Sequence, residues 1–545
     1  MVHFTRLRRL FAGTAIVAAV ALTTSGCGSS GSNSAVADQS TSTSTAAGAP
    51  APAAPAAGGT DAAAASSGKA AAAATTAAAN TANTDTAAKG AATTATGTTS
   101  TAVTPAKVAK GGTTKAAGGK APAAAPGQPA APADAGATTT GAAAVAKVVA
   151  SAPIFGGTTP CVPANLSEVP IGNVSTLSGI LGELFAPARS AIQTFVASQN
   201  ACGGLNGHKI KLFIDDDQDD PATAASKVTE MIQKNKVLAF CGNIQVLTME
   251  AVAPVIKKYG IPIIGTDISN NTWFTTPLVF PQGSDVQSIS YGYLDATKNY
   301  FHKTVLGNLS CIEVPRPCEA LDRSIREMAP QFGIDYKKNI QTSITAPSYV
   351  QQCLDMKTAG VEALILDIDA ASMVRVARSC EQVGYFPKVL AYPLAVGNEK
   401  QFLAGDKWLG DTYVPMNVFP WQGNVTPAEK YWQDSIKKFN PGFTSGGAAS
   451  LGWSAGALLV AASAELSATN PTTQQFLDAL WEFKGQKFTE LGGLAGPRTF
   501  GKDQNPRVPY CLFNAIGNDT NTGWKSVADK PTCSKVIAAS DPQHG

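Results

Sequence analysis

Short apolar runs alternate with amphipathic segments from about residue 161 onward. Residues 208–216 and 237–242 have the length and apolar character of strands. Between them, residues 221–235 place apolar side chains three and four positions apart, which predicts a helix. A second predicted helix, 248–260, ends at a glycine and leads into a further strand. Repeated β-α-β units of this kind predict a parallel sheet with helices on both faces.

The same alternation starts again after about residue 300. Further helices are expected at 348–360 and 372–384, and a helical region over 426–483 precedes a β-rich piece over 497–527. Two successive α/β lobes are therefore expected, and proteins of this design commonly bind ligands between their halves. The strands expected in the second lobe are 304–310, 340–346, 363–369 and 388–395.

The N-terminus has the pattern of an export signal. Three arginines precede the apolar stretch Leu10–Leu22, which is the size of a secretory signal peptide. Thr24-Ser25-Gly26-Cys27 follows and resembles a bacterial lipobox. We therefore expect residues 1–26 to be removed and Cys27 to carry a lipid anchor. An ordinary secretory cleavage site is the alternative.

Residues 27–160 are expected to be a disordered tether. Ala, Thr, Gly, Ser and Pro dominate residues 28–153, which contain no Phe, Tyr or Trp. Such a segment buries too little apolar surface to offset the entropy lost on ordering. As a flexible coil it would span roughly 60 Å between its ends. Its Thr and Pro content also fits O-glycosylation.

Charge and motif content exclude several classes of function. Charged residues make up 15% of the chain and the net charge is +3, so no nucleic-acid partner is implied. No uninterrupted apolar segment reaches the roughly 18 residues of a membrane span. The chain has four histidines and no CxxC, HExxH or P-loop pattern. We therefore expect no metal and no cofactor, and contact with the membrane only through the lipid.

The ten cysteines agree with an oxidising compartment. With Cys27 assigned to the lipid an odd number remains, and Cys241, which ends an apolar strand, is the expected unpaired thiol. Connectivity cannot be deduced from sequence. The candidate pairs are Cys161–Cys202, Cys311–Cys318, Cys353–Cys380 and Cys511–Cys533.

Several short motifs, in their order, resemble the leucine/isoleucine/valine-binding-protein family, the type I substrate-binding proteins of ABC importers. Each motif is weak, but their order and spacing agree from about residue 167 to 530. The matching pieces are Leu177-Ser178-Gly179, the turn 203–207 (GGLNG), the acidic strand end with Asp220-Pro221, and segments 253–266, 393–398 and 451–466.

The resemblance implies a two-lobed type I periplasmic-binding-protein fold of the α/β class. Each lobe would be a doubly wound, mainly parallel sheet flanked by helices. Hinge crossings would fall near Gln282, Met416 and Phe488. One lobe would contain 161–282 plus 417–487, and the other 283–416 plus 488–534, followed by a tail, 535–545. The resemblance also implies a monomer on the extracytoplasmic face of the membrane, with an ABC transporter permease as its partner.

Five aspartates lie among residues 215–220, and such density suggests a calcium loop. The EF-hand template fails, because its glycine position holds Asp220 in one register and Ala224 in the other. A structural interpretation needs no ion. Asp220 would cap a helix whose first residue is Pro221.

Residues 452–456 fit the G-x-S-x-G pattern of a nucleophile elbow. That elbow needs a strand before Ser454, but residues 443–450 read as a loop. It also needs a later histidine, and the only one is His544, next to the C-terminus. We therefore expect a helix here, and a protein that is not an enzyme.

In open α/β sheets, ligands bind beyond the carboxyl ends of the strands, near a topological switch point. The loops expected there supply donors and acceptors from both lobes, with Tyr291 near the hinge. The candidate ligand-binding residues are Ser178, Asn243, Gln245, Thr248, Asp267, Ser269, Tyr291, Asp369 and Tyr392.

Two departures from the family's pattern bear on the ligand. Val246 and Leu247 stand where amino-acid binders have small hydroxyl residues, and Leu394 replaces the acid that holds the ammonium. Burying an ammonium without a counter-charge is costly, although Asp267 or Asp369 could substitute. An amino-acid-like solute, an amide and a small organic acid therefore stay open.

The expected function is capture of a small molecule in an interlobe cleft and its delivery to an ABC importer. Two alternatives use the same fold. One is a ligand-sensing ectodomain for a membrane signalling partner. The other is a cell-envelope lipoprotein whose cleft no longer binds a ligand.

Overall fold

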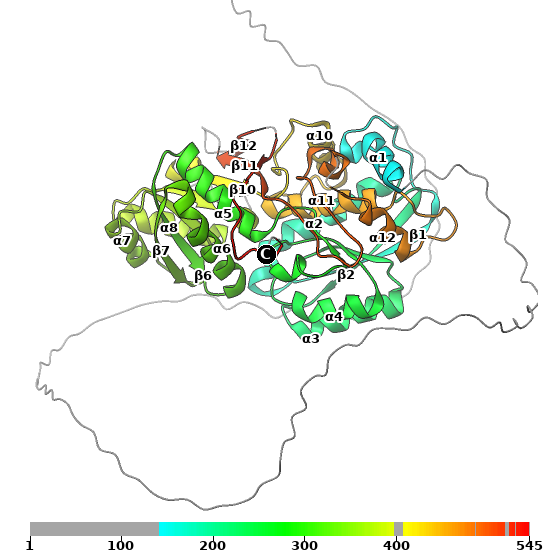
Figure 1. The fold of residues 1–545 in the computed structure, drawn as a ribbon, viewed down its shortest axis with the longest axis horizontal. Helices are drawn as coiled ribbons and strands as arrows, with labels where there is room; N and C mark the ends of the chain where they lie inside the picture. Colours follow the sequence, from blue (N-terminus) through cyan, green and yellow to red (C-terminus); the bar gives the residue numbers. More distant parts are fainter. Residues whose placement is uncertain (1–140, 397–406, 485–486, 518–522, 529, 544–545) are drawn as a thin grey trace, which may run out of the picture. The chain divides into compact units, whose positions relative to one another are not determined.

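The computed structural model describes residues 141–396, 407–484, 487–517, 523–528 and 530–543. The expected signal peptide, the lipidated Cys27 and most of the expected tether lie outside these residues. Within them the chain builds two α/β lobes, each around its own sheet (Figure 1). The predicted fold class is confirmed.

The first lobe contains a five-stranded parallel sheet of order β2-β1-β3-β4-β5. Helices α3 and α4 lie on one face, and α2 and α11 on the other (Figure 1). The strands are β1 (Leu166–Ser175), β2 (His208–Asp216), β3 (Ala239–Asn243), β4 (Ile263–Thr266) and β5 (Val279–Phe280). The helices are α2 (Gly179–Asn200), α3 (Pro221–Glu230), α4 (Met249–Tyr259), α10 (Pro427–Phe439), α11 (Gly447–Ala462) and α12 (Thr473–Trp481).

The second sheet has the order β12-β11-β10-β9-β8-β6-β7, and β13 pairs with β11. It is parallel from β7 to β10, and β11 runs antiparallel to its neighbours. The strands are β6 (Val305–Cys311), β7 (Asp335–Thr342), β8 (Ala363–Asp367), β9 (Lys388–Ala391), β10 (Tyr413–Met416), β11 (Cys511–Gly517), β12 (Trp524–Ser526) and β13 (Thr532–Cys533). The helices are α5 (Val286–Asp295), α6 (Pro315–Met328), α7 (Val350–Thr358) and α8 (Ala370–Gln382).

Short helical turns connect these elements. Four of them, η1, η2, η4 and η5, extend or follow a longer helix, and one, η6, lies directly after β9 beside the site described below. They are η1 (Pro153–Phe155), η2 (Met231–Asn235), η3 (Asn271–Trp273), η4 (Ala296–Tyr300), η5 (Ala329–Phe332), η6 (Pro393–Ala395), η7 (Lys407–Asp411) and η8 (Lys487–Gly493).

Helix α11 is buried on every side, which its small residues permit. A Cβ atom on Gly265 of β4 would lie 2.2 Å from the Cβ of Ala455, so the strand and the helix touch along their backbones. Ser454 lies in the middle of this helix and donates to the carbonyl of Ser450 at 2.5 Å. The G-x-S-x-G sequence is therefore a helix-packing motif and has no strand-turn-helix elbow around its serine.

The aspartates of 215–220 have structural partners. Asp220 accepts a hydrogen bond from the Thr223 N–H at 2.7 Å and caps α3, as expected. Asp217 is buried and accepts from the Thr248 hydroxyl at 2.6 Å. Within the described ranges no group of three or more His, Cys, Asp or Glu side chains is arranged to hold a metal ion.

The folded part begins earlier than expected. Residues 141–151 form α1 (Gly141–Ser151), whose Val145 and Val149 are buried in the core of the first lobe. Residues 27–160 are therefore not tether throughout. The Ala-rich composition gave no sign of a helix here. Two valines four positions apart lie on one face of α1, and this face packs beside α11 and α12.

The third passage between the lobes also lies elsewhere. Phe500 and Val508 belong to the core of the first lobe, and Tyr510 is packed in the core of the second. The chain therefore crosses near Pro509 rather than near Phe488. The expected tail is not separate either, because Ala538 is 2% exposed within the second lobe's core.

Three of the four expected disulfides are present: Cys161–Cys202, Cys353–Cys380 and Cys511–Cys533. Cys241 is a buried free thiol. Cys311 and Cys318, expected as a fourth pair, are two unbonded thiols in this structure.

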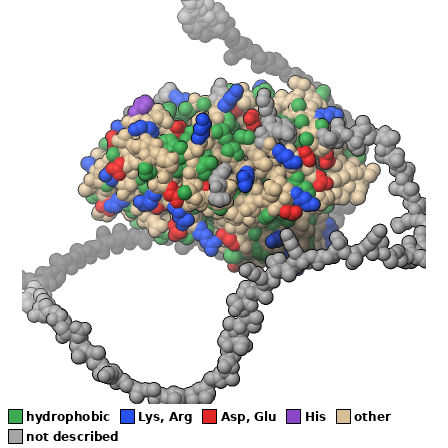
Figure 2. All heavy atoms as spheres, in the orientation of Figure 1, with side chains coloured by type: hydrophobic (Ala, Val, Ile, Leu, Met, Phe, Trp, Pro, Cys, Tyr) green, Lys and Arg blue, Asp and Glu red, His purple; other side chains and the backbone are tan. Residues whose placement is uncertain are grey.

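Acidic and basic side chains are interspersed on the face that Figure 2 shows, so that face carries no single-sign field. Across the described part of the chain, no helix combines the length and hydropathy that a membrane span requires.

Candidate functional site

The strand order places the switch points of both sheets. The order reverses direction between β1 and β3 in the first lobe and between β6 and β8 in the second. Loops that leave the carboxyl ends of neighbouring strands at such a point diverge and open a crevice. A pocket lies there, lined from both lobes; we refer to it as the interlobe pocket.

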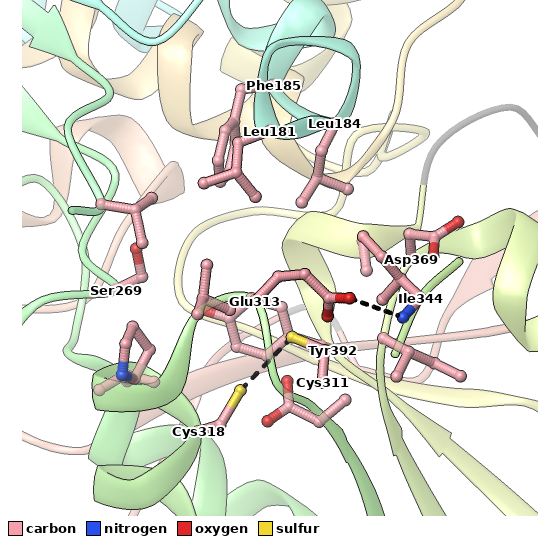
Figure 3. Close-up of a pocket in the computed structure, with 17 residues that line it drawn as sticks. Leu181, Leu184, Phe185, Ser269, Cys311, Glu313, Cys318, Ile344, Asp369 and Tyr392 are labelled. Atoms are coloured by element: carbon pink, nitrogen blue, oxygen red, sulfur yellow. Dashed lines mark hydrogen bonds between the residues drawn. The ribbon is translucent and has the colours of Figure 1, made fainter. Parts of the chain in front are cut away.

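The walls of the interlobe pocket are mainly apolar (Figure 3). Leu181, Leu184 and Phe185, from the first turns of α2, form one side. Val246, from the loop after β3, adds to this side, and Ile344 faces it from the second lobe. These side chains would surround the apolar body of a small solute.

Glu313 brings a carboxylate to the pocket wall from the loop between β6 and α6. Its Oε1 accepts hydrogen bonds from the Ser343 hydroxyl at 2.7 Å and from the Ile344 N–H at 3.1 Å, the latter drawn in Figure 3. Its Oε2 is buried and has no protein partner. A buried carboxylate oxygen without a donor is costly, so this atom is open to a donor on a ligand.

Asp367, at the carboxyl end of β8, is a second acid of the pocket and is 6% exposed. Burial raises the pKa of its carboxyl to about 7, and a hydrogen bond with Cys318 opposes part of that rise. Near neutral pH this side chain is therefore divided between a carboxylate and a neutral carboxylic acid that can donate a proton.

Tyr392 follows β9 and lies where the hydrophobic cores of the two lobes meet. Its ring packs against the core of the first lobe and against the cores on both faces of the second sheet. Burial, with Asp367 as a secondary cause, raises the pKa of its hydroxyl well above the ordinary value, so it stays neutral. Among the described residues no protein group pairs with that hydroxyl, which is free to hydrogen-bond a ligand.

Of the nine ligand-binding residues predicted from sequence, Ser269, Asp369 and Tyr392 line the interlobe pocket. Asp369 also caps α8, accepting from the Ala371 N–H at 2.9 Å. Ser269 lies beside the pocket but donates its hydroxyl to Asp267.

Asn243, Gln245, Thr248 and Asp267 are not lining residues of the pocket and bond to other protein groups. Asp267 accepts from the backbone N–H groups of Gln245 and Ser269, each at 2.8 Å, and so fixes two loops together. Asn243 donates to Gln245 at 3.2 Å, and Thr248 donates to Asp217. The proposed substitute for the ammonium-binding acid, Asp267, is thus occupied by protein donors.

The remaining two candidates lie away from the pocket lining. Ser178 is exposed at the N-cap of α2. Tyr291 packs against Phe332, with ring centroids 6.0 Å apart. Leu394, in the place of the family's ammonium-binding acid, is 2% exposed in the first lobe's core.

The structure adds residues that sequence reasoning missed. Asp367 ends a strand and Glu313 lies in a loop that follows one, so their positions pointed to the site, but nothing in the sequence ranked them above their neighbours. Leu181, Leu184 and Phe185 look like ordinary residues of an amphipathic helix. Only the position of α2 between the lobes shows that they face a pocket.

A sequence profile described as "periplasmic binding protein" matches residues 168–519. No curated protein sequence matches the chain.

Solved structures share the fold. A possible leucine/isoleucine/valine-binding protein from Rhodopirellula baltica is 17% identical, with a TM-score of 0.55, and the match covers 68% of this chain and 99% of that one. A fatty acid ABC transporter substrate-binding protein from Thermomonospora curvata is 18% identical, with a TM-score of 0.57, covering 69% and 95%. A branched chain amino acid ABC transporter protein from Thermus thermophilus with bound valine is 15% identical, with a TM-score of 0.58, covering 68% and 97%.

Proposed function

Because the chain belongs to the periplasmic binding protein family, we propose that it captures a small solute outside the cytoplasm and delivers it to an ABC importer. We further propose that a lipid on Cys27 anchors it and that it acts as a monomer. The observation that supports capture is the interlobe pocket, which takes its lining from both lobes. A solute that contacts both walls favours the closed arrangement over the open one.

The charges of the pocket support a particular class of solute. The ionisable carboxyl groups that line it are those of Glu313, Asp367 and Asp369, and none of its lining residues is a lysine or an arginine. An anionic ligand would meet only like charges there. We therefore propose a neutral or cationic solute with an apolar body and an amine or amide group, in preference to an organic acid anion.

Glu313 is the proposed partner of that amine or amide. Its Oε1 is held by Ser343 and Ile344, which fixes the direction of the carboxylate, and its Oε2 is left without a donor. The apolar body would then extend towards Leu181, Leu184 and Phe185. Glu313 would thus supply the counter-charge that Leu394 cannot.

A matched ligand series tests this assignment by titration calorimetry. Leucinamide, isocaproamide and isocaproate share one isobutyl body and carry a cation, a neutral amide and an anion. We expect leucinamide and isocaproamide to bind and isocaproate to bind at least about tenfold more weakly, roughly 1.4 kcal/mol. Preferential binding of isocaproate would contradict the proposed solute class.

The variant Glu313→Gln separates charge from shape. It should weaken the binding of leucinamide by about tenfold or more, or roughly 1.4 kcal/mol. The affinity for isocaproamide should change much less, because an amide at residue 313 can still accept a hydrogen bond. Glu319→Gln, on an exposed position of the adjacent α6, is the matched control and should leave both affinities unchanged. Equal losses for both ligands would show that Glu313 supports the loop and does not pair with a charge.

A further inference from the structure

Two thiols lie side by side in the wall of the interlobe pocket. Cys311 ends β6 and Cys318 lies in the first turns of α6, and their Sγ atoms are 3.7 Å apart (Figure 3). Both side chains line the pocket, at 7% and 2% exposure. They are the only described cysteines that line it.

The other cysteines give this pair its context. Three disulfides are formed in the same structure. The third free thiol, Cys241, is 1% exposed in the first lobe's core and is not a pocket residue. A chain that carries disulfides works where oxidants are present, so a close pair of pocket thiols is exposed to oxidation whenever the pocket opens.

Bond formation between these thiols would change the pocket wall. A disulfide needs an Sγ–Sγ distance of about 2.05 Å, so the two sulfurs must approach by about 1.7 Å from their present separation. Residues 312–317 connect them, and this segment contributes Glu313, Val314 and Pro317 to the pocket lining. Any shift of β6 towards α6 therefore moves residues that would contact the solute.

Burial protects the two thiols in the arrangement seen here. Oxidation by exchange requires a thiolate and access for the oxidant. Both side chains are buried here, and the hydrogen bond with Cys311, together with burial, raises the pKa of Cys318 above its ordinary value. Opening of the lobes would admit water and oxidant to the pocket wall.

We propose that Cys311 and Cys318 form a reversible thiol–disulfide site in the interlobe pocket, and that its oxidation weakens solute binding. This inference rests on the proposed solute-binding function. The reaction partner is a disulfide, either of a small thiol such as glutathione or of a dithiol oxidoreductase.

The exchange balances without any further reagent. One pocket thiolate attacks the external disulfide, forms a mixed disulfide and releases one external thiolate. The second pocket thiolate then displaces the other external thiolate and closes the Cys311–Cys318 bond. Two protons leave the pocket thiols, and two electrons pass to the external disulfide, which becomes two thiols.

Linkage makes the effects of solute and disulfide on one another reciprocal. In the arrangement seen here both thiols are buried and unbonded, and a solute that holds the lobes in this arrangement would keep them so. If bound solute disfavours the disulfide, the disulfide must weaken solute binding by the same factor. We expect a difference of at least about tenfold in solute affinity between the two forms.

The first measurement is a redox titration of the full-length protein in glutathione buffers, with the bond followed by peptide mapping after alkylation. We expect the Cys311–Cys318 bond to form and break reversibly while the three other disulfides persist. A pair that stays reduced in fully oxidised buffer, or stays bonded in reducing buffer, would overturn the proposal.

The second measurement applies leucinamide and isocaproamide to both redox forms. Weaker binding to the disulfide form supports the inference. Equal binding to both forms overturns it and leaves the solute-binding function intact, whereas binding to neither form contradicts the proposed solute class as well.

Serine variants provide the controls. Cys311→Ser with Cys318→Ser should show the same solute affinity in oxidising and in reducing buffer. Cys241→Ser keeps the pocket pair and should keep the redox dependence. If the double variant does not fold, the wild-type titration and the two-form binding comparison still decide the question.

Discussion

At the residue scale, the acids of the site have different tasks that their sequence context did not reveal. Asp267 and Asp369 were the acids predicted to face the ligand. In the structure, Asp267 accepts hydrogen bonds from backbone N–H groups of two loops, and Asp369 caps α8. Glu313 has one oxygen without a hydrogen-bond donor, and burial raises the pKa of Asp367. Such differences depend on which donors surround a carboxyl group, and neighbours distant in sequence supply those donors.

Asp367 gives the protein a specific pH dependence of stability. Its pKa is about 7 in the folded protein, above the ordinary value of 3.8. Between these values the folded state binds more protons than the unfolded state, so the free energy of unfolding falls as pH rises through this window. Asp367→Asn should flatten that slope and stabilise the protein at pH 8 by on the order of 1–3 kcal/mol.

Thermal unfolding at a series of pH values between about 4 and 8, the interval spanned by the two pKa values, measures this effect. An Asp367→Asn variant with the slope of the wild type would show that Asp367 is not the responsible group.

At the element scale, the alternation of strands and helices was predictable because each element carries its own periodicity, as 208–216 and 221–235 do. The helix over 452–456 was predictable too, because its small residues suit close packing. Helix α1 and the crossing near Pro509 were not predicted. Helix α1 depends on contacts with α11, α12 and η8, which local patterns do not contain. The segment before the crossing depends on the packing of Phe500 against Phe280 and Phe483.

The contact between β4 and α11 tests the role of small residues in this packing. Gly265 has φ +76°, and a Cβ there would lie 2.2 Å from the Cβ of Ala455. Gly265→Ala should therefore reduce the free energy of unfolding by about 3 kcal/mol or more. Gly260, with φ +65° and no atom within 4 Å of its would-be Cβ, is the matched control. Gly260→Ala incurs only the backbone term, about 1 kcal/mol.

Urea denaturation of the two variants measures that difference. Since both glycines have left-handed backbone conformations, the excess loss in Gly265→Ala isolates the contact with α11. Equal losses in the two variants would contradict close backbone packing at this position.

At the scale of the whole molecule, the two-lobed fold was predictable from the order of weak motifs, while the end of the chain was misjudged. Residues 535–545 looked like a polar tail. In the structure, Gln543 donates to the buried Asp285 at 2.5 Å, and Ser540 donates to Glu327 at 3.0 Å. Asp285 caps α5 directly after the first crossing between the lobes. The end of the chain thus braces the second lobe next to the hinge.

Removal of residues 535–545 should therefore destabilise the protein, because it strips buried partners from Asp285 and uncovers the core around Ala538. We expect a loss of about 2–4 kcal/mol in the free energy of unfolding. An unchanged midpoint in the shorter chain would show that the contacts of 535–543 carry no stability.

The interlobe pocket is proposed to hold one small amine- or amide-bearing solute with an apolar body. Native mass spectrometry of the full-length protein, purified without added ligand, tests it most directly, with Leu184→Glu as the variant whose pocket wall is disrupted. We expect one bound molecule of this class per chain in the wild type and none in the variant. A bound organic acid without nitrogen, or the same bound mass in both proteins, would contradict it.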